Sequence, residues 1–325
     1  MSNKGGAIVL GASGFIGTRL IRQLTAEREY SVVRAVDIAP PRERLDSVEY
    51  HLLDVREPLP PALGEGASRL YNLAAIHRTP GHPTNEYYDT NIGGALNATD
   101  LAVKSGINQI VFASSISVYG PSEELLDERS PLRPISAYGR SKRFAEEIHR
   151  RWKEGESGRR LVIVRPGVVF GPGERGNYTN LVRALKRGVF VYPGRRDVVK
   201  SGGYVDELLG AINYAVGRPD PYVLFNFAYP TASTTEDIVK TFSEVMGCRT
   251  NYPTIPTTPM LAVAAVFEGL NSAGLRNPIH RERIMKLSLS TRISPGWLLA
   301  NGYSFKTNLR SALERWSKET DSRFD

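Results

Sequence analysis

The sequence is poor in cysteine, which excludes two classes of protein. Cys248 is the only cysteine among the 325 residues, so no internal disulfide framework and no cysteine-rich zinc module can form. Apolar runs are also short, since none reaches the roughly 18 residues that a membrane-spanning helix needs. The first residues lead into a strand pattern without the apolar stretch and cleavage site of a signal peptide. We therefore expect a cytoplasmic protein.

Motifs for binding nucleic acid or metal are missing as well, although the charge is basic. Lys+Arg number 42 and Asp+Glu 34, which gives a net charge of +8. The basic residues form short scattered clusters without a helix-turn-helix, zinc-finger or RNA-binding signature, so we expect no nucleic-acid partner. His77 and His82 lack the spacing of metal ligands, so no metal is expected. A solvated basic surface, an anionic small substrate and an anionic membrane surface remain as explanations of the charge.

Short β-branched runs alternate with helical patterns through the first half of the chain. Strands are predicted at residues 7–10, 31–37, 49–55, 69–75, 109–115 and 161–167. Helices are predicted at residues 18–26, 85–104 and 137–153. This alternation indicates βαβ crossovers and a parallel sheet covered on both faces. We predict an α/β fold with a doubly wound, Rossmann-type parallel sheet in residues 1–167, and a smaller substrate-binding region in residues 168–325 that partly returns to the sheet.

The most apolar helical pattern covers residues 257–270. It is too short to span a bilayer. A helix packed in the core or in an interface explains it simply, and a helix lying on a membrane surface is the alternative. The sequence leaves both interpretations open.

A glycine-rich turn follows the first predicted strand and precedes a helix. Glycine permits a positive φ and a close approach of the backbone to a pyrophosphate, and the helix N-terminus presents unpaired N–H groups to the phosphates. In this strand–turn–helix context the pattern predicts a dinucleotide site. Its residues are Gly11, Ser13, Gly14, Phe15, Ile16 and Gly17.

Asp37 ends the second predicted strand, 20 residues beyond Gly17. A carboxylate there accepts hydrogen bonds from the adenine-ribose hydroxyls and repels a 2′-phosphate, which favours NAD over NADP. Arginines close by in the sequence are the counter-argument, because a guanidinium accommodates that phosphate. They are Arg34, Arg42 and Arg44.

Tyr138 and Lys142 are spaced i, i+4 at the start of a predicted helix, so the phenol and the amine share one helix face. A neighbouring ammonium, together with a positive nicotinamide ring, favours the phenolate and lowers the pKa of a tyrosine that must act as a base. A serine at the carboxyl end of the preceding strand can hydrogen-bond both the substrate oxygen and the tyrosine. Ser115 is the first choice for this serine and Ser114 the second, and a structural cap is the alternative role.

In this order the motifs resemble the extended short-chain dehydrogenase/reductase family, and within it the NAD-dependent sugar epimerase/dehydratase branch. The nearest similarity is to 4-epimerases of N-acetylglucosamine carried on a nucleotide or on a polyprenyl diphosphate. The likeness covers nearly the whole chain. Besides the residues above, it rests on Asp54-Val55, Asn72-Leu-Ala-Ala75, Asn91 and Arg165-Pro166.

The resemblance implies roles for further residues and for partners. Asp54 and Val55 would flank the adenine. The nicotinamide side of the cofactor would be bordered by Leu73, Ala74, Ala75 and Ser114. Asn91 would brace the catalytic helix or its water. The sugar and its diphosphate would contact His77, Asn177, Lys200 and Arg283. A homodimer through residues 85–104 and 137–153 is the expected assembly.

Two positions depart from the pattern of nucleotide-sugar relatives, and a pair of residues departs from that of the dehydratases. Nucleotide-sugar enzymes often have asparagine where this chain has Val168, and arginine where it has Lys200, which lacks the bidentate fork of a guanidinium. The resemblance therefore leaves the carrier open between a nucleotide and a polyprenyl diphosphate. The 4,6-dehydratases of the family have an Asp-Glu pair where this chain has Ile116-Ser117, so dehydration lacks its catalysts.

These residues predict a 4-epimerase of a diphosphate-linked sugar that works through a transient 4-keto intermediate, with NAD as a hydride store. An NAD(P)H-dependent oxidoreductase for keto-sugars or hydroxysteroid-like substrates would use the same Tyr, Lys and Ser. A non-catalytic NAD-sensing protein on this fold is the third hypothesis. If the substrate is lipid-linked, the basic charge and residues 257–270 suit contact with the inner membrane surface.

Overall fold

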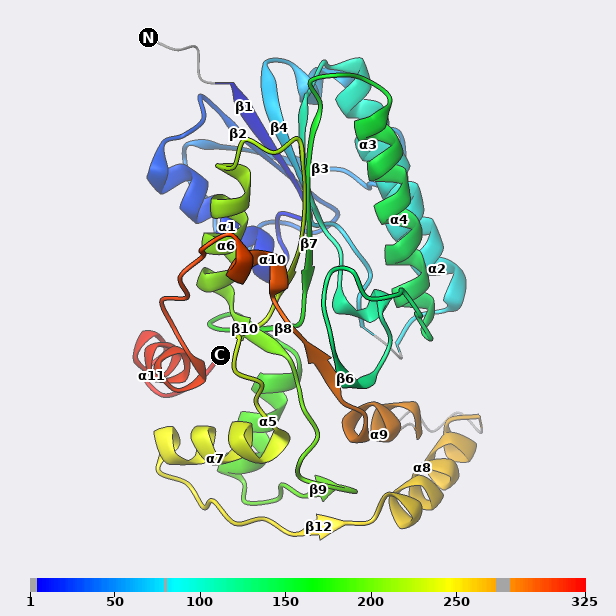
Figure 1. Ribbon diagram of the computed structural model, residues 1–325, viewed down its shortest axis with the longest axis vertical. Coiled ribbons are helices and arrows are strands. Elements are labelled where there is room, and N and C mark those ends of the chain that lie inside the picture. Colours follow the sequence, from blue (N-terminus) through cyan, green and yellow to red (C-terminus); the bar gives the residue numbers. More distant parts are fainter. Residues whose placement is uncertain (1–4, 79–80, 273–280) are drawn as a thin grey trace.

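The computed structural model describes residues 5–78, 81–272 and 281–325, with side chains except at 269–272 and 282–283 (Figure 1). Its main feature is a seven-stranded, all-parallel sheet in the order β11-β7-β5-β4-β1-β2-β3. The strands are β1 (Gly6–Leu10), β2 (Val33–Asp37), β3 (Val48–Leu52), β4 (Ala67–Asn72), β5 (Gln109–Ala113), β7 (Arg160–Pro166) and β11 (Tyr222–Phe227). The predicted doubly wound α/β fold is confirmed.

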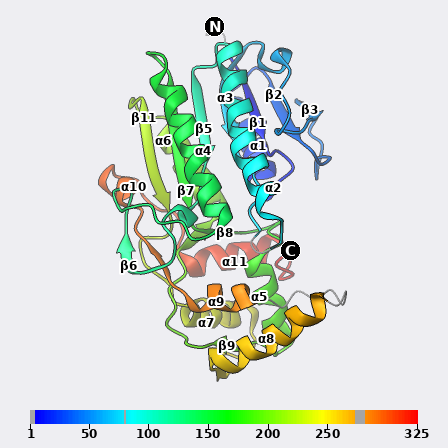
Figure 2. The ribbon, with the colours of Figure 1, turned by 90° about the vertical axis from the view of Figure 1, so that its right-hand side faces the viewer.

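Helices cover both faces of this sheet (Figures 1 and 2). On one face lie α1 (Phe15–Glu27) and α6 (Val205–Val216), and on the other α3 (Gly94–Lys104) and α4 (Ala137–Glu154). Strand β1 is apolar throughout because both of its faces are covered by helices. Val9 packs towards α1 and Ile8 towards α3, and both are fully buried. Six strands fall where the first half of the sequence predicts them, and β11 adds the edge strand from the second half.

The predicted helix at 85–104 is interrupted. It consists of α2 (Thr84–Tyr88), a π-helical turn at Asp89–Gly93, and α3. Asn91 lies in the π-helical turn and is buried. A π-turn re-aims the side chains within it, and such turns are frequent at functional sites.

The remaining elements form a second layer beneath the carboxyl edge of the sheet. They are β6 (Ser122–Leu126), β8 (Val168–Phe170), α5 (Asn177–Lys186), β9 (Tyr192–Pro193), β10 (Gly202–Tyr204), α7 (Thr235–Met246), β12 (Thr254–Ile255), α8 (Thr257–Ser272), α9 (Arg281–Ser288), β13 (Thr291–Ile293) and α11 (Leu309–Glu319). The short helix α10 (Gly296–Ala300) packs instead against β11 of the sheet. Their core is aromatic: Phe170, Phe242 and Trp316 are fully buried and in contact. This layer faces the ends of the strands that carry the predicted catalytic residues.

The helix predicted at 257–270 is present as α8, but it is not a core helix. Val263 is 54% exposed and Val266 64% exposed, and among its described side chains only Ala264 is buried. Of the interpretations left open by the sequence, packing in the core is therefore excluded, since α8 lies at the rim of the second layer and contacts mainly α9. An interface and a membrane surface remain for its apolar side chains. Over the described residues no helix has the length and apolarity to cross a membrane.

Acid should destabilise the fold through His149, which is fully buried against the sheet and stacked on Phe112. Burial lowers the pKa of His149 to about 4, against about 6.5 in an unfolded chain. The unfolded state therefore binds the extra proton first, and stability present above pH ~6.5 is lost as the pH falls towards ~4. The loss attributable to this group is about 3 kcal/mol.

Denaturant titrations over this pH range check the prediction. A His149→Gln variant should show a much flatter pH dependence of the unfolding free energy than the wild type. An exposed histidine gives the control, so His82→Gln should keep the wild-type slope. Equal slopes for wild type and His149→Gln would contradict the assignment.

Candidate active site

The carboxyl edge of the parallel sheet gathers most of the predicted site residues. Gly11 follows β1, Asp37 ends β2, Ala74 follows β4 and Ser115 follows β5. In open α/β sheets this edge is where ligands bind. The topology thus brings together residues that lie more than 100 positions apart in the sequence.

The glycine-rich turn forms a cradle that side chains would fill. Gly11 has a φ of +81°, and a Cβ there would lie 2.7 Å from the Ala74 backbone nitrogen. A Cβ on Gly17 would overlap the Gly11 carbonyl oxygen. Gly14 caps α1 without a side-chain hydrogen bond, so the first N–H groups of α1 are left for another acceptor. This geometry fits a pyrophosphate over the turn.

Asp37 ties the turn to the loop that follows β2. Its carboxylate accepts hydrogen bonds from the backbone N–H of Ser13 at 2.9 Å and of Ala39 at 3.0 Å. The Ser13 hydroxyl donates to the Ala39 carbonyl at 2.9 Å. Ile16 packs on the core beneath the turn, and Phe15 lies beside Gly173. The carboxylate is thus held at the point where a ribose would lie.

The three arginines near Asp37 are engaged elsewhere. Arg34 pairs with Glu49 at 2.9 Å. Arg42 donates to the Gly173 carbonyl at 2.8 Å, and the Arg44 guanidinium lies 5.3 Å from the centre of the Tyr50 ring. Their partners are protein groups, which favours NAD over a 2′-phosphorylated dinucleotide.

The next two groups of predicted cofactor residues have different surroundings. Asp54 closes a tight ion pair with Arg56, and the hydrogen bonds from Arg56 hold the pKa of this carboxyl below its usual value. Val55 is buried and packs against Gly94 at the start of α3. Half-buried Leu73, Ala74 and Ala75 run along the cradle.

Tyr138 sits in the first turn of α4, where the Ser136 side chain caps the helix by accepting from the Gly139 N–H at 3.0 Å. Burial raises the pKa of the Tyr138 phenol to about 12, and a hydrogen bond with Ser115 opposes the rise. The predicted lowering by a neighbouring amine is therefore not produced by the protein's own groups. The structure does bring the phenol and the Ser115 hydroxyl together, as predicted.

Lys142 explains why the lowering is absent. Its side chain is buried, and its amine donates to the Ala113 carbonyl at 2.8 Å and lies 4.8 Å from the centre of the Phe112 ring. Burial lowers the pKa of Lys142 to about 7, against the opposing charge of Glu146. An amine that holds its proton weakly at neutral pH stabilises a phenolate only weakly.

The two candidate serines point to opposite sides of the strand end. Ser115 caps a short 3₁₀ turn, because its hydroxyl oxygen accepts from the Ser117 N–H at 3.1 Å. Ser114 donates to the buried Glu146 carboxylate at 2.6 Å. The cap and the contact with Tyr138 belong to the same hydroxyl, so both roles foreseen for Ser115 coexist.

A buried ion pair behind the catalytic face was missed by the sequence interpretation. Arg165 and Glu146 are joined by two hydrogen bonds of 2.8 and 2.6 Å, and each residue is at most 1% exposed. Arg165 also donates to the Tyr119 hydroxyl at 2.7 Å, which donates to Asn226 at 2.8 Å. The signal that could have found it is the spacing of Tyr138, Lys142 and Glu146, four residues apart on one helix face.

Asn91 performs the bracing expected of it. Its amide donates to the Ser141 hydroxyl of α4 at 2.8 Å and to the Ile76 carbonyl at 3.1 Å. Its carbonyl oxygen accepts from the Ile76 N–H at 3.0 Å. The π-turn therefore links the segment after β4 to the catalytic helix.

The predicted substrate residues are less tightly grouped. His77 lies in the segment after β4, and desolvation lowers its pKa, with smaller contributions from the charges of Arg78 and Lys142. Asn177 is the first residue of α5 and is exposed. Arg283 lies on α9, and its side chain is outside the described residues.

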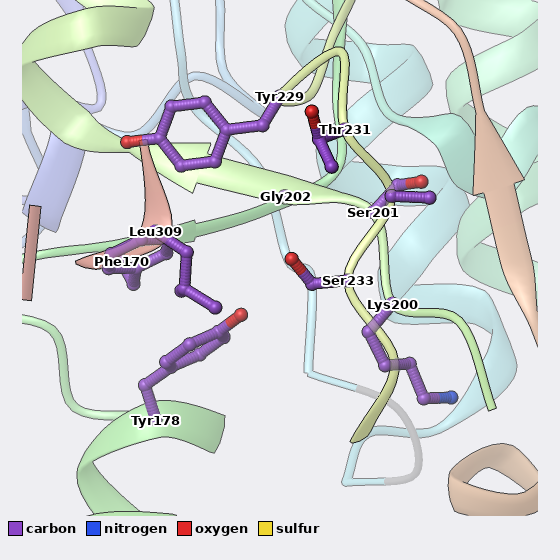
Figure 3. Close-up of a pocket in the computed structure, with 10 residues that line it drawn as sticks. Phe170, Tyr178, Lys200, Ser201, Gly202, Tyr229, Thr231, Ser233 and Leu309 are labelled. Carbon is purple, nitrogen blue, oxygen red and sulfur yellow. The ribbon is translucent and has the colours of Figure 1, made fainter. Parts of the chain in front are cut away.

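Lys200 borders a small pocket, but its amine points away from the other lining residues (Figure 3). The amine donates to the carbonyls of Lys286 at 2.8 Å and Leu289 at 2.6 Å. Burial lowers the pKa of Lys200 to about 8. The lysine thus caps the C-terminal end of α9 in this structure.

The sequence and the fold are similar to those of known sugar epimerases. An N-acetyl-alpha-D-glucosaminyl-diphospho-ditrans,octacis-undecaprenol 4-epimerase of Escherichia coli O157:H7 is 29% identical over 320 residues, 95% of this chain and 93% of the relative. The solved UDP-N-acetylglucosamine 4-epimerase from Methanobrevibacter ruminantium M1 superposes with a TM-score of 0.77 at 19% identity, covering 99% of each chain.

A second solved structure, the UDP-glucuronic acid 4-epimerase from Bacillus cereus in complex with NAD, superposes with a TM-score of 0.75. It is 18% identical and covers 98% of this chain and 100% of its own. The model of the NAD dependent epimerase/dehydratase family matches residues 7–226, which include the glycine cradle, Tyr138 and Lys142. The chain therefore belongs to the NAD dependent epimerase/dehydratase family.

Proposed function

We propose that the protein is an NAD-dependent 4-epimerase of N-acetylglucosamine carried on a polyprenyl diphosphate. The observation that carries the proposal is the arrangement at the carboxyl edge of the sheet, where Ser115 follows β5 and Tyr138 lies in the first turn of α4, on the same edge as the glycine cradle. The Escherichia coli relative, which covers 95% of the chain, supports the sugar and the carrier.

Tyr138, as phenolate, takes the proton of the C4 hydroxyl while the hydrogen on C4 leaves as a hydride. NAD bound over the cradle supplies the reversible hydride acceptor. Ser115 holds the C4 oxygen, and Lys142 orients the cofactor ribose in place of its bond to Ala113. The resulting 4-keto sugar turns in the site, hydride returns to its other face, and Tyr138 gives the proton back.

The charge of the cofactor matters for the phenol. A phenol with a pKa near 12 holds its proton at neutral pH, and Lys142 compensates little. A cationic nicotinamide ring beside the phenol favours the phenolate. We infer that Tyr138 loses its proton readily only when the oxidised cofactor is bound.

The cofactor contacts follow the geometry of the cradle. We assign the pyrophosphate to the N–H groups of Phe15, Ile16 and Gly17 in the first turn of α1, and the adenine ribose to Asp37. The backbone from Leu73 to Ala75 lies opposite, against Gly11. Asp54 and Val55 remain candidates for the adenine side.

Two departures from nucleotide-sugar enzymes support the lipid carrier. Val168 offers no amide to a nucleotide-linked sugar. Lys200 would have to exchange its two α9 carbonyls for the diphosphate before it could anchor a nucleotide. Asn177, Arg283 and His77 are the further residues that we assign to the sugar and its diphosphate.

The rival oxidoreductase function uses the same Tyr138, Lys142 and Ser115, so geometry does not separate it. The fate of the cofactor separates the two functions, since an epimerase regenerates NAD in every turnover, whereas a reductase consumes added NADH. A dehydratase is disfavoured, because buried Ile116 and half-buried Ser117 stand where its acidic pair would be.

A test of the function incubates purified protein with N-acetylglucosamine diphosphate carried on a polyprenyl chain, without added cofactor. We expect inversion at C4, and we expect Tyr138→Phe to reduce the rate about 10²–10⁴-fold, because the acid–base group is lost. Tyr222→Phe, which removes a phenol hydroxyl at the N-terminal end of β11 and away from the carboxyl edge, is the matched control. Net accumulation of NADH without an inverted product would refute the proposal.

We also propose that the protein acts in the cytoplasm as a homodimer through α3 and α4, which lie side by side on one face of the sheet (Figure 2). Both helices present large apolar side chains to solvent, Leu96 and Val103 at 53% and Phe144 at 55%. Leu96 and Val103 are seven residues apart and share one face of α3. Such a shared apolar face suits a symmetric interface.

Light scattering checks the assembly. Wild type should have the mass of two chains, and the double variant Leu96→Glu with Val103→Glu should have the mass of one, because four carboxylates would then meet in the interface. A monomeric wild type, or a variant that stays dimeric, would contradict this surface.

A further inference from the structure

The helix α8 exposes an apolar stripe. Pro259, Ala262, Val263 and Val266 are spaced i, i+3, i+4 and i+7, so they fall on one face of the helix, and all four are exposed. Glu268 is the only charged residue of the helix, and it pairs with Arg281 of α9 at 2.7 Å. A helix surface facing water normally carries more polar residues than this.

The neighbouring segment extends the apolar surface. Met285 and Leu287 of α9 are 49% and 52% exposed, and Leu289, which follows α9, is 40% exposed. Figures 1 and 2 show α8 and α9 side by side at the end of the molecule away from the N-terminus. We call Pro259–Val266 together with Met285–Leu289 the α8–α9 surface.

The stretch of sequence that contains this surface is basic. Residues 249–292 contain six Lys and Arg against two Glu, so this short part of the chain supplies half of the net charge of +8. Apolar side chains among basic ones are the signature of a segment that lies on an anionic bilayer. A second copy would instead bring two basic surfaces together, which like-charge repulsion disfavours.

The α8–α9 surface is tied to the catalytic half. Lys200 bonds the carbonyls of Lys286 and Leu289 at the end of α9. The chain then runs into β13, which pairs in parallel with β6. Strand β6 follows the loop from Ser115 to Tyr119, so the surface keeps a fixed relation to the catalytic serine. A bilayer held there would present a lipid-borne sugar to the site at a set distance.

We propose that the α8–α9 surface lies on the headgroup region of an anionic phospholipid bilayer and delivers the site to its lipid-linked substrate. This inference rests on the proposed function, since it explains how the enzyme reaches that substrate. The helix does not cross the bilayer, because it is too short; it lies in the interface, with Val263 and Val266 inserted and the basic side chains on the lipid phosphates.

Vesicle co-sedimentation tests the surface directly. We expect wild type to bind vesicles that contain phosphatidylglycerol, and to bind pure phosphatidylcholine much less. The double variant Val263→Glu with Val266→Glu should bind these vesicles at least about tenfold more weakly, because the apolar insertion is lost and the added carboxylates are repelled by the anionic lipid. A matched variant, Leu52→Glu with Leu299→Glu, changes two exposed apolar side chains elsewhere and adds the same charge, so it should bind like wild type.

Equal binding of wild type and the Val263/Val266 variant would overturn the proposal, and so would a variant with altered native mass, which would make α8 a contact between protein copies. Activity assays separate this failure from that of the function. The variant should epimerise a water-soluble short-prenyl substrate at the wild-type rate and a vesicle-embedded long-chain substrate at about a tenth of it or less. Wild type that inverts neither substrate would refute the proposed function, whatever the vesicle result.

Discussion

The packing of α4 against the carboxyl half of the sheet is the constraint on which the site depends. The buried pair of Glu146 with Arg165 fixes the helix to β7, and removal of either partner would leave an uncompensated charge in the core. Because Tyr138, Lys142 and Glu146 are four residues apart, this pair also sets the direction of the phenol and the amine. Asn91 holds the same helix from its other side through Ser141.

The burial that positions the Tyr138 and Lys142 side chains also disfavours their charged forms. It raises the pKa of Tyr138 to about 12 and lowers that of Lys142 to about 7, so both groups tend towards their neutral forms. Without the oxidised cofactor the Tyr138 phenol stays protonated, so it cannot act as a base until a hydride acceptor is present. This suits an enzyme in which proton and hydride must leave C4 together, and it explains why the tyrosine needs Ser115 within reach.

Local spacing was enough to predict the sheet, the glycine cradle and the Tyr138–Lys142 pair, because each depends on residues close in the sequence. The expected lowering of the phenol pKa combined the Lys142 ammonium with a positive nicotinamide ring. Burial, which depends on the whole fold, makes the share of the amine small, so the ring must supply most of the lowering. The helical spacing points to Glu146, but its partner Arg165 lies in a distant segment, as do the carbonyls that Lys200 caps, so no short pattern contains either contact as a whole. The exposure of α8 was open for the same reason: its stripe of small apolar residues suits a core as well as a surface.

Transfer of a label at C4 tests the central claim, that one phenol and one enclosed hydride acceptor invert the same carbon. The substrate carries deuterium on C4, and the reaction runs in ordinary water with added unlabelled NADH. The account predicts an inverted product that keeps its deuterium, because the hydride leaves and returns within one site. Replacement of the deuterium by hydrogen from water or from the added NADH would contradict it.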